Sequence, residues 1–156
     1  MLRPGTPAPQ FTATLDDGST FDLASYRGAK NVVLYFYPKD FTAGCTKEAC
    51  AFRDDYSEIT RHNAVLVGVS SDDEASHGAF REKHRLPFPL IADPGREIIG
   101  LYDARGLLGM TARVTYVVDT AGIVRAAFRH EILIGRHRSA VVKALEAIEA
   151  APDVRR

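Results

Sequence analysis

Two uninterrupted apolar runs, at residues 31–37 and 64–69, limit the folds open to this chain. A run of apolar residues without alternation fits a strand that is covered on both faces, as in the centre of a parallel sheet. The first run stops at Pro38, and residues 42–61 between the two runs have the pattern of a helix. Because a strand, a helix and a parallel strand form a right-handed crossover, we expect a sheet with helices on both sides.

The remaining segments complete a single α/β domain. Residues 11–15 and 19–22 are expected to form a hairpin around the Asp-Asp-Gly sequence at 16–18. Further helices are predicted at 71–84, 96–102 and 137–150, and extended segments at 88–92, 113–119 and 123–128. A βαβ half followed by a ββα half is the thioredoxin-like arrangement, here a central mixed sheet with an N-terminal β-hairpin extension. Since we find no repeat, low-complexity tract or linker, we expect residues 1–156 to form one domain.

Composition excludes several classes of protein. Twenty basic residues balance twenty acidic ones, whereas a nucleic-acid-binding protein usually has a basic excess. The N-terminus has no apolar segment of the kind found in signal peptides, and no apolar run approaches the ~18 residues of a membrane span. We therefore expect no nucleic acid or membrane as a partner, and a cytoplasmic location. Two cysteines are too few for a disulfide scaffold, so the close pair is redox-active, metal-bound or incidental.

The two cysteines follow the first buried strand, where open α/β sheets place their sites. Thr42 is a favourable N-cap residue, which would put Cys45 at about the third position of the helix. Backbone N–H groups at that position lack an intrahelical partner, and the helix dipole is positive there. The sequence therefore predicts that Cys45 is stabilised as a thiolate.

The spacing of Cys45 and Cys50 argues against a static disulfide. Five helical residues separate Cα atoms by roughly 8.6 Å, whereas a disulfide needs about 4.4–6.8 Å. Cys50 would also point about 140° away from Cys45, toward the exposed, polar side of the helix. A bond between the two sulfurs is thus expected only after the first helical turns unwind.

Residues 35–50, YFYPKDFTAGCTKEAC, resemble the active site of the peroxiredoxins. The pattern PxxxTxxC at 38–45 is similar to the family signature, and CTKEAC at 45–50 resembles the peroxiredoxin Q branch, also called bacterioferritin comigratory protein. The resemblance extends over GxxAPxF at 5–11, SxD at 70–72 and RxTYVVD at 113–119. Phe41 and Ala43 depart from the common family sequence Asp-Thr-Pro-Gly-Cys-Thr, which bears on loop rigidity and on substrate preference.

The resemblance implies a thiol peroxidase with two working cysteines. Cys45 would be the peroxidatic cysteine, which attacks hydrogen peroxide or an alkyl hydroperoxide and becomes a sulfenic acid. Cys50 would be the resolving cysteine, which condenses with that acid to an intramolecular disulfide. Thioredoxin or a similar dithiol protein would reduce the disulfide. Members of this branch are often monomers, with some dimers.

The same resemblance gives roles to four further residues. Thr42 would hydrogen-bond the peroxide and the sulfur through its hydroxyl, and Pro38 would shield the thiolate from water. Arg113, which leads a late strand, would reach Cys45 and the substrate oxygens. Glu48, one turn beyond the cysteine, would hold Arg113 and Thr42 in place.

Other interpretations of the cysteine pair stay open on the residues alone. A thioredoxin-like protein dithiol oxidoreductase would usually have Cys-x-x-Cys, in which both sulfurs close without unwinding the helix. A peroxide sensor would use oxidation of the pair to change binding to a partner. A zinc site needs four ligands, and the five histidines show no metal spacing and are expected to be solvated or structural. We therefore expect no metal and no other cofactor.

Overall fold

The computed structural model describes residues 1–129 and 134–151, with backbone only for 134–139. A seven-stranded sheet in the order β2-β1-β5-β4-β3-β6-β7 forms its centre. The strands are β1 (Thr12–Leu15), β2 (Thr20–Asp22), β3 (Asn31–Phe36), β4 (Ala64–Ser70), β5 (Leu90–Ala92), β6 (Val114–Val118) and β7 (Val124–Arg129). The helices are α1 (Ala43–Asp54), α2 (Tyr56–Thr60), α3 (Glu74–His84), α4 (Glu97–Leu101) and α5 (Ile134–Ala150). Two short 3-10 helices, η1 (Leu23–Tyr26) and η2 (Leu107–Gly109), complete the described elements.

The predicted parallel crossover is confirmed. β3 pairs in parallel with β4, and β4 in parallel with β5, while β6 pairs antiparallel with the other edge of β3. All six residues of β3 are buried, as expected for a central strand. The sheet is thus mixed, with the N-terminal hairpin β1–β2 attached to it through β5.

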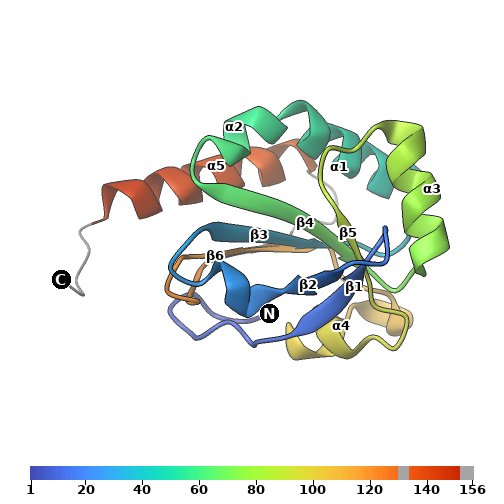
Figure 1. Ribbon diagram of the computed structural model, residues 1–156, viewed down its shortest axis with the longest axis horizontal. Coiled ribbons are helices and arrows are strands. Elements are labelled where there is room, and N and C mark those ends of the chain that lie inside the picture. The colour runs from blue at the N-terminus through green and yellow to red at the C-terminus, as the bar shows by residue number, and fades with distance from the viewer. Residues whose placement is uncertain (130–133, 152–156) are drawn as a thin grey trace.

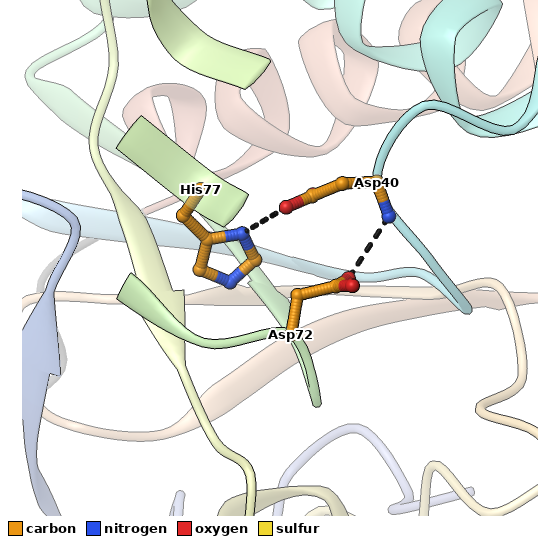
Figure 2. A group of neighbouring side chains, drawn as sticks. All are labelled: Asp40, Asp72 and His77. Atoms are coloured by element: carbon orange, nitrogen blue, oxygen red, sulfur yellow. Dashed lines mark hydrogen bonds and ion pairs between the residues drawn. The ribbon is translucent and has the colours of Figure 1, made fainter. Parts of the chain in front are cut away.

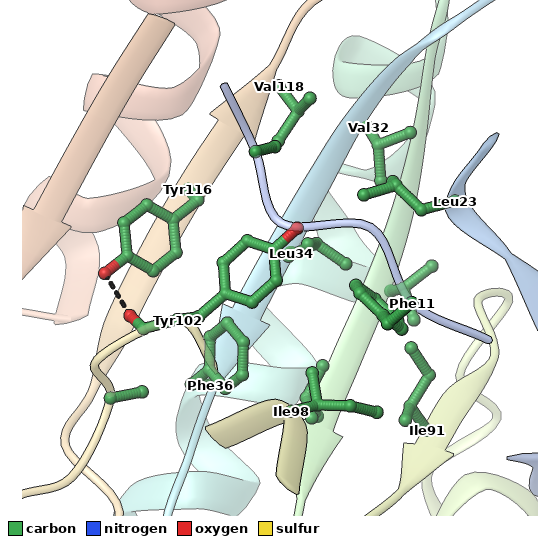
Figure 3. Packing of buried hydrophobic residues seen from close by; sticks show 14 of the residues in the cluster. Phe11, Leu23, Val32, Leu34, Phe36, Ile91, Ile98, Tyr102, Tyr116 and Val118 are labelled. Carbon is green, nitrogen blue, oxygen red and sulfur yellow. Dashed lines mark hydrogen bonds between the residues drawn. The ribbon is translucent and has the colours of Figure 1, made fainter. Parts of the chain in front are cut away.

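Helices cover both faces of the sheet, with α1, α2, α3 and α5 on one face and α4 on the other (Figure 1). Alternation along β3 divides the core accordingly. Val33 and Tyr35 belong to the apolar cluster under α1, whereas Leu34 and Phe36 belong to the cluster on the opposite face. In that second cluster the Tyr116 hydroxyl donates to the carbonyl of Tyr102 (Figure 3).

The structure corrects three predicted boundaries. The helix expected over 42–61 is two helices, because the backbone at Asp55 leaves the helical region at φ −99° and ψ 9°. α3 begins at Glu74 and not at residue 71, because the Asp73 side chain caps it by accepting from the Ser76 amide. α5 begins at Ile134, earlier than the expected residue 137. Of the five histidines, residues 130 and 137 fall outside the described side chains.

The topology brings two distant segments together at one end of the sheet. The chain leaves β3 at Phe36 and reaches α1 through a short loop, and β6 begins directly after Arg113. Phe36 pairs with Val114 in the antiparallel register, so Arg113 lies beside the loop that leads to α1.

Within the described residues, no helix is both long and apolar enough to cross a membrane.

Candidate active site

Cys45 is the third residue of α1, the position that the sequence predicts. It is a free thiol with 1% of its surface exposed, and it packs into the apolar cluster that contains Ala49 and Phe52. The first amides of α1 have no partner within the helix, so they are donors available to an anion near the cysteine. The sulfur therefore lies beside a small group of polar donors within an otherwise apolar wall.

Thr42 occupies the N-cap position of α1, but its side chain does not cap the helix. Its backbone is extended, at φ −73° and ψ 151°, as a cap residue requires. Its hydroxyl instead donates to the carbonyl of Lys39 at 2.8 Å. Because the hydroxyl hydrogen is used there, the Thr42 oxygen faces other partners as an acceptor.

Arg113 lies against the first turn of α1. A Cβ atom placed on Gly44 would be 2.7 Å from Nη2 of Arg113, so the guanidinium packs directly on the residue before Cys45. Nη1 of Arg113 also donates to Oε1 of Glu48 at 3.4 Å, and Glu48 is 1% exposed. The structure therefore brings together Arg113, Glu48 and the start of the Cys45 helix, whereas the Thr42 hydroxyl bonds to Lys39.

Pro38 is half-buried at the end of β3 and lines a cavity of about 230 Å³. The other lining residues come mainly from the segment that precedes β6: Gly106, Leu107, Met110, Thr111, Ala112 and Arg129. Leu107 and Met110 are largely exposed, at 84% and 56%. An apolar, open cavity thus adjoins the loop between Pro38 and Cys45.

Cys50 is less accessible than the sequence predicts. It is half-buried, and its Sγ lies 3.9 Å from Nδ1 of His84 at the end of α3. The prediction of an exposed cysteine on the polar face is therefore wrong, because α3 packs over that part of α1. Arg53, one turn further along α1, donates to the carbonyl of His84 at 2.8 Å.

A buried polar network behind the loop was missed by the sequence analysis. Asp40 is 3% exposed, and His77 on α3 is fully buried. Nδ1 of His77 lies 2.7 Å from Oδ2 of Asp40, while the backbone amide of Asp40 donates to Asp72 at 2.9 Å (Figure 2). Tyr37 donates to the other oxygen of Asp40 at 2.6 Å, and Ser76 donates to Oδ2 at 2.8 Å. The loop before Thr42 is thereby fixed to the start of α3.

The protonation of this network follows from its contacts. Nε2 of His77 lies 2.9 Å from the carbonyl oxygen of Ile91, which can only accept, so Nε2 carries a hydrogen. Burial alone would lower the pKa of His77, but the hydrogen bond and charge of Asp40, with the Ile91 carbonyl, outweigh it and raise the pKa. Burial, with Tyr35 and Asp40 nearby, also raises the pKa of Tyr37 well above its ordinary value.

Asp40, Asp72 and His77 also have the spacing of a metal site, since their ligand atoms lie within 4.8 Å of one another. Those atoms are already used within the protein. Besides the bonds to Asp40, Asp72 Oδ2 accepts from the hydroxyl of Ser70 at 2.6 Å. We therefore interpret the cluster as a structural hydrogen-bond network. Of the two roles expected for the histidines, solvated or structural, His77 has the structural one. The SxD pattern at 70–72 was the one sequence signal that pointed to it.

The sequence of the chain matches known proteins over most of its length. The sequence profile of the AhpC/TSA family matches residues 4–127. The chain is 41% identical over 149 residues to a chloroplastic peroxiredoxin Q of Populus jackii, covering 94% of this chain and 70% of that protein. It is also 41% identical over 148 residues to the chloroplastic peroxiredoxin Q of Arabidopsis thaliana, covering 94% and 68%.

Solved structures show the same fold. The peroxidoxin BcpB of Mycobacterium tuberculosis superposes with a TM-score of 0.87 at 32% identity, over 95% of this chain and 99% of the other. The bacterioferritin comigratory protein of Xanthomonas campestris, studied for alkyl peroxide reduction, superposes with a TM-score of 0.82 at 30% identity, over 88% and 91%. Peroxiredoxin Q of that organism has also been solved as cysteine-to-serine mutants.

Proposed function

Because the chain belongs to the AhpC/TSA family and is a thiol peroxidase of the atypical two-cysteine type, we propose that Cys45 attacks the peroxide and that Cys50 resolves the product. The observation that carries this assignment is the packing of Arg113 on Gly44, beside Glu48. That contact puts a positive charge and the free amides of α1 next to a buried thiol. Cys50 instead lies in the interior of α1, beside His84.

The peroxidatic step is a displacement at oxygen. The Cys45 thiolate attacks one peroxide oxygen, the O–O bond breaks, and the other oxygen leaves as water or an alcohol once it is protonated. Negative charge develops on the departing oxygen, and donors aimed at such a charge are each worth about 10²–10³ in rate. Arg113 and the first amides of α1 supply these donors. The Thr42 oxygen, whose hydrogen is held by Lys39, accepts the hydrogen of the incoming hydroperoxide.

The resolving step requires local unwinding of α1. Cys45 and Cys50 lie on the same intact helix, too far apart for a disulfide. After unwinding, the Cys50 sulfur attacks the sulfur of the Cys45 sulfenic acid and water leaves. The product is a Cys45–Cys50 disulfide, with both electrons lost by the two thiols taken up by the peroxide.

The substrates are hydrogen peroxide and alkyl hydroperoxides. Hydrogen peroxide needs only the donors beside Cys45, whereas the apolar cavity next to Pro38 would hold the alkyl group of a larger hydroperoxide. Pro38 itself covers the edge of the site and limits access of water.

Thioredoxin or a similar dithiol protein is the proposed reductant. Cys50 is half-buried in the wound helix, so unwinding, which brings it to Cys45, is also what would make the disulfide accessible. A cytoplasmic location is proposed because reduction of the disulfide by a dithiol protein suits a reducing compartment. A monomer is proposed as the working unit, because Cys45, Cys50 and Arg113 all come from one chain.

The test separates the two cysteines. Purified wild type, Cys45→Ser and Cys50→Ser are each given one equivalent of hydrogen peroxide, and remaining peroxide and protein mass are measured. Wild type should consume the peroxide and become lighter by about two hydrogens, without a covalent dimer. Cys50→Ser should consume one equivalent but fail to turn over with thioredoxin. Unchanged peroxide consumption by Cys45→Ser would refute the assignment.

A further inference from the structure

The resolving cysteine has a histidine within reach of its sulfur. Nδ1 of His84 lies 3.9 Å from Sγ of Cys50, a distance at which a thiol can hydrogen-bond to nitrogen. Both residues are half-buried, so the contact is partly shielded from water. The reaction assigned to Cys45 uses no part of this contact.

Two neighbours besides Cys50 hold His84 in place, one through its ring and one through its backbone. The ring of Phe80, one turn earlier on α3, packs edge-on at a centroid distance of 5.1 Å. The carbonyl of His84 accepts a hydrogen bond from Arg53 at 2.8 Å, which ties its backbone to α1. His84 is thus fixed by both helices, with its ring directed at the sulfur.

We propose that His84 is the base that accepts the proton of Cys50 in the resolving step. The inference rests on the proposed function, in which Cys50 attacks the sulfenic acid of Cys45. That attack needs a thiolate, and an ordinary thiol is only about 3% ionised at pH 7. In the tautomer with its hydrogen on Nε2, His84 presents the Nδ1 lone pair to the Cys50 S–H.

The step balances without a further reagent. His84 takes the proton of Cys50 while α1 is still wound, which leaves a thiolate and an imidazolium. After unwinding, the thiolate attacks the Cys45 sulfur, the S–S bond forms, and the S–O bond breaks with loss of hydroxide. The proton from His84 converts that hydroxide to water.

The other described histidine side chains are engaged elsewhere. His77 is enclosed in the network with Asp40, and His62 lies 2.9 Å from Glu149 through its Nδ1 atom. Within the described part of the chain, neither of them hydrogen-bonds to a cysteine. His84 is accordingly the base that the described part of the chain offers to Cys50.

The test uses His84→Asn, because the Asn side chain can reach the position of Nδ1 but is not basic. Wild type and variant are oxidised with one equivalent of hydrogen peroxide, quenched at successive times and examined by mass. Formation of the sulfenic acid at Cys45 should be unchanged. Conversion to the disulfide should slow by about tenfold to thirtyfold at pH 7, the range that full ionisation of a thiol can supply.

A matched variant and a chemical rescue separate proton transfer from packing. Arg53→Ala breaks the same α1–α3 contact without touching the imidazole, and it should form the disulfide no more slowly than wild type. Added imidazole should accelerate disulfide formation in His84→Ala, and not in wild type or Arg53→Ala. His84→Gln serves as a second substitution if His84→Asn does not fold.

Two results would overturn the proposal. One is a wild-type rate of disulfide formation in His84→Asn. The other is a slow His84→Ala that imidazole does not rescue, which would make His84 a packing residue only. Failure of wild type to form any sulfenic acid would instead overturn the proposed function, so the two failures are distinguishable.

Discussion

The guanidinium of Arg113 occupies the space that a side chain on Gly44 would need. Gly44 is therefore required for close approach and not for an unusual backbone conformation. Gly44, which precedes the proposed peroxidatic Cys45, thus determines how close the positive charge of Arg113 comes to the first turn of α1.

Gly44→Ala should displace Arg113 and lower the second-order rate constant with hydrogen peroxide by about 10²-fold, the value of one such donor. Gly78→Ala is the matched control, since Gly78 also lies in a helix and its nearest neighbour is an ordinary 3.8 Å away. That control should keep its activity and gain about 1 kcal/mol in stability. Stopped-flow peroxide kinetics and urea unfolding measure both effects. Equal activity in the two variants would contradict the packing argument.

Met110→Ser should change substrate preference and leave the chemistry intact. Met110 lines the apolar cavity beside Pro38 and is remote in sequence from Cys45. Loss of its apolar surface should reduce kcat/KM for a bulky hydroperoxide such as cumene hydroperoxide by about tenfold, equivalent to about 1.4 kcal/mol. The value for hydrogen peroxide should stay within about twofold. A parallel loss with both substrates would show that the cavity does not bind the alkyl group.

Lys47→Gly should speed the resolving step. Lys47 is exposed on α1 between the two cysteines, and glycine costs a helix about 1 kcal/mol relative to ordinary residues. The unwound state should then be populated about fivefold more, so that less sulfinic acid forms under excess peroxide. Ser57→Gly is the control, because it weakens α2 outside the unwinding segment. The fraction of sulfinic acid should be measured by mass after titration with peroxide. It should fall in Lys47→Gly and stay at the wild-type value in Ser57→Gly.

His77 makes stability depend on pH. The pKa of His77 is raised in the folded protein, so its protonation stabilises the fold. This contribution to stability is fully present below the pKa of His77 in the unfolded chain, about 6.5. It is lost as pH rises through the folded pKa, which lies higher. The free energy of unfolding should be measured by urea titration for wild type and for His77→Gln. The excess stability of wild type over the variant should shrink above about pH 6.5. A stability difference that grows with pH would contradict the raised pKa of His77, because it would mean that the fold favours the neutral imidazole.

Phe41 has a left-handed backbone, at φ +64°, and its ring packs edge-on against Phe80 at 5.2 Å. Phe41→Ala removes the contact and keeps the backbone strain, whereas Phe41→Gly removes both. We expect Phe41→Gly to be the more stable of the two by about 1 kcal/mol, the cost of a left-handed L-residue. Equal unfolding midpoints would show that this backbone conformation is not strained.

The sequence was sufficient for those parts of the fold that depend on local pattern. The apolar run of β3 and the cap position of Thr42 each depend only on residues that are neighbours in the sequence. The strand, the start of α1 and the place of Cys45 as the third residue of that helix could therefore be predicted. Arg113 was reached through its motif. The packing of Arg113 on Gly44 could not be predicted from the sequence, because only the pairing of β3 with β6 brings these two residues together.

The contacts made by α3 explain what the sequence could not supply. Asp40 and Cys50 each meet a histidine of α3, His77 and His84, more than thirty positions away. The sequence alone gives no reason to pair these residues with the histidines. His84 was expected to be solvated or structural. The break at Asp55 was missed for a related reason, since the pattern of apolar residues continues through it into α2.

The part of the chain that unwinds in the proposed resolving step is attached to α3 at both ends. Asp40 is bound to Ser76 and His77 before the reactive turn, and Arg53 is bound to the His84 carbonyl after it. We expect these contacts to confine unwinding to about a dozen residues and to keep the two ends of that segment a fixed distance apart. Short tethered loops close in about 10–100 ns, and helices reform within about a microsecond. Once the disulfide has been reduced, the enzyme is ready again far sooner than a fresh oxidant molecule arrives by diffusion at micromolar concentration.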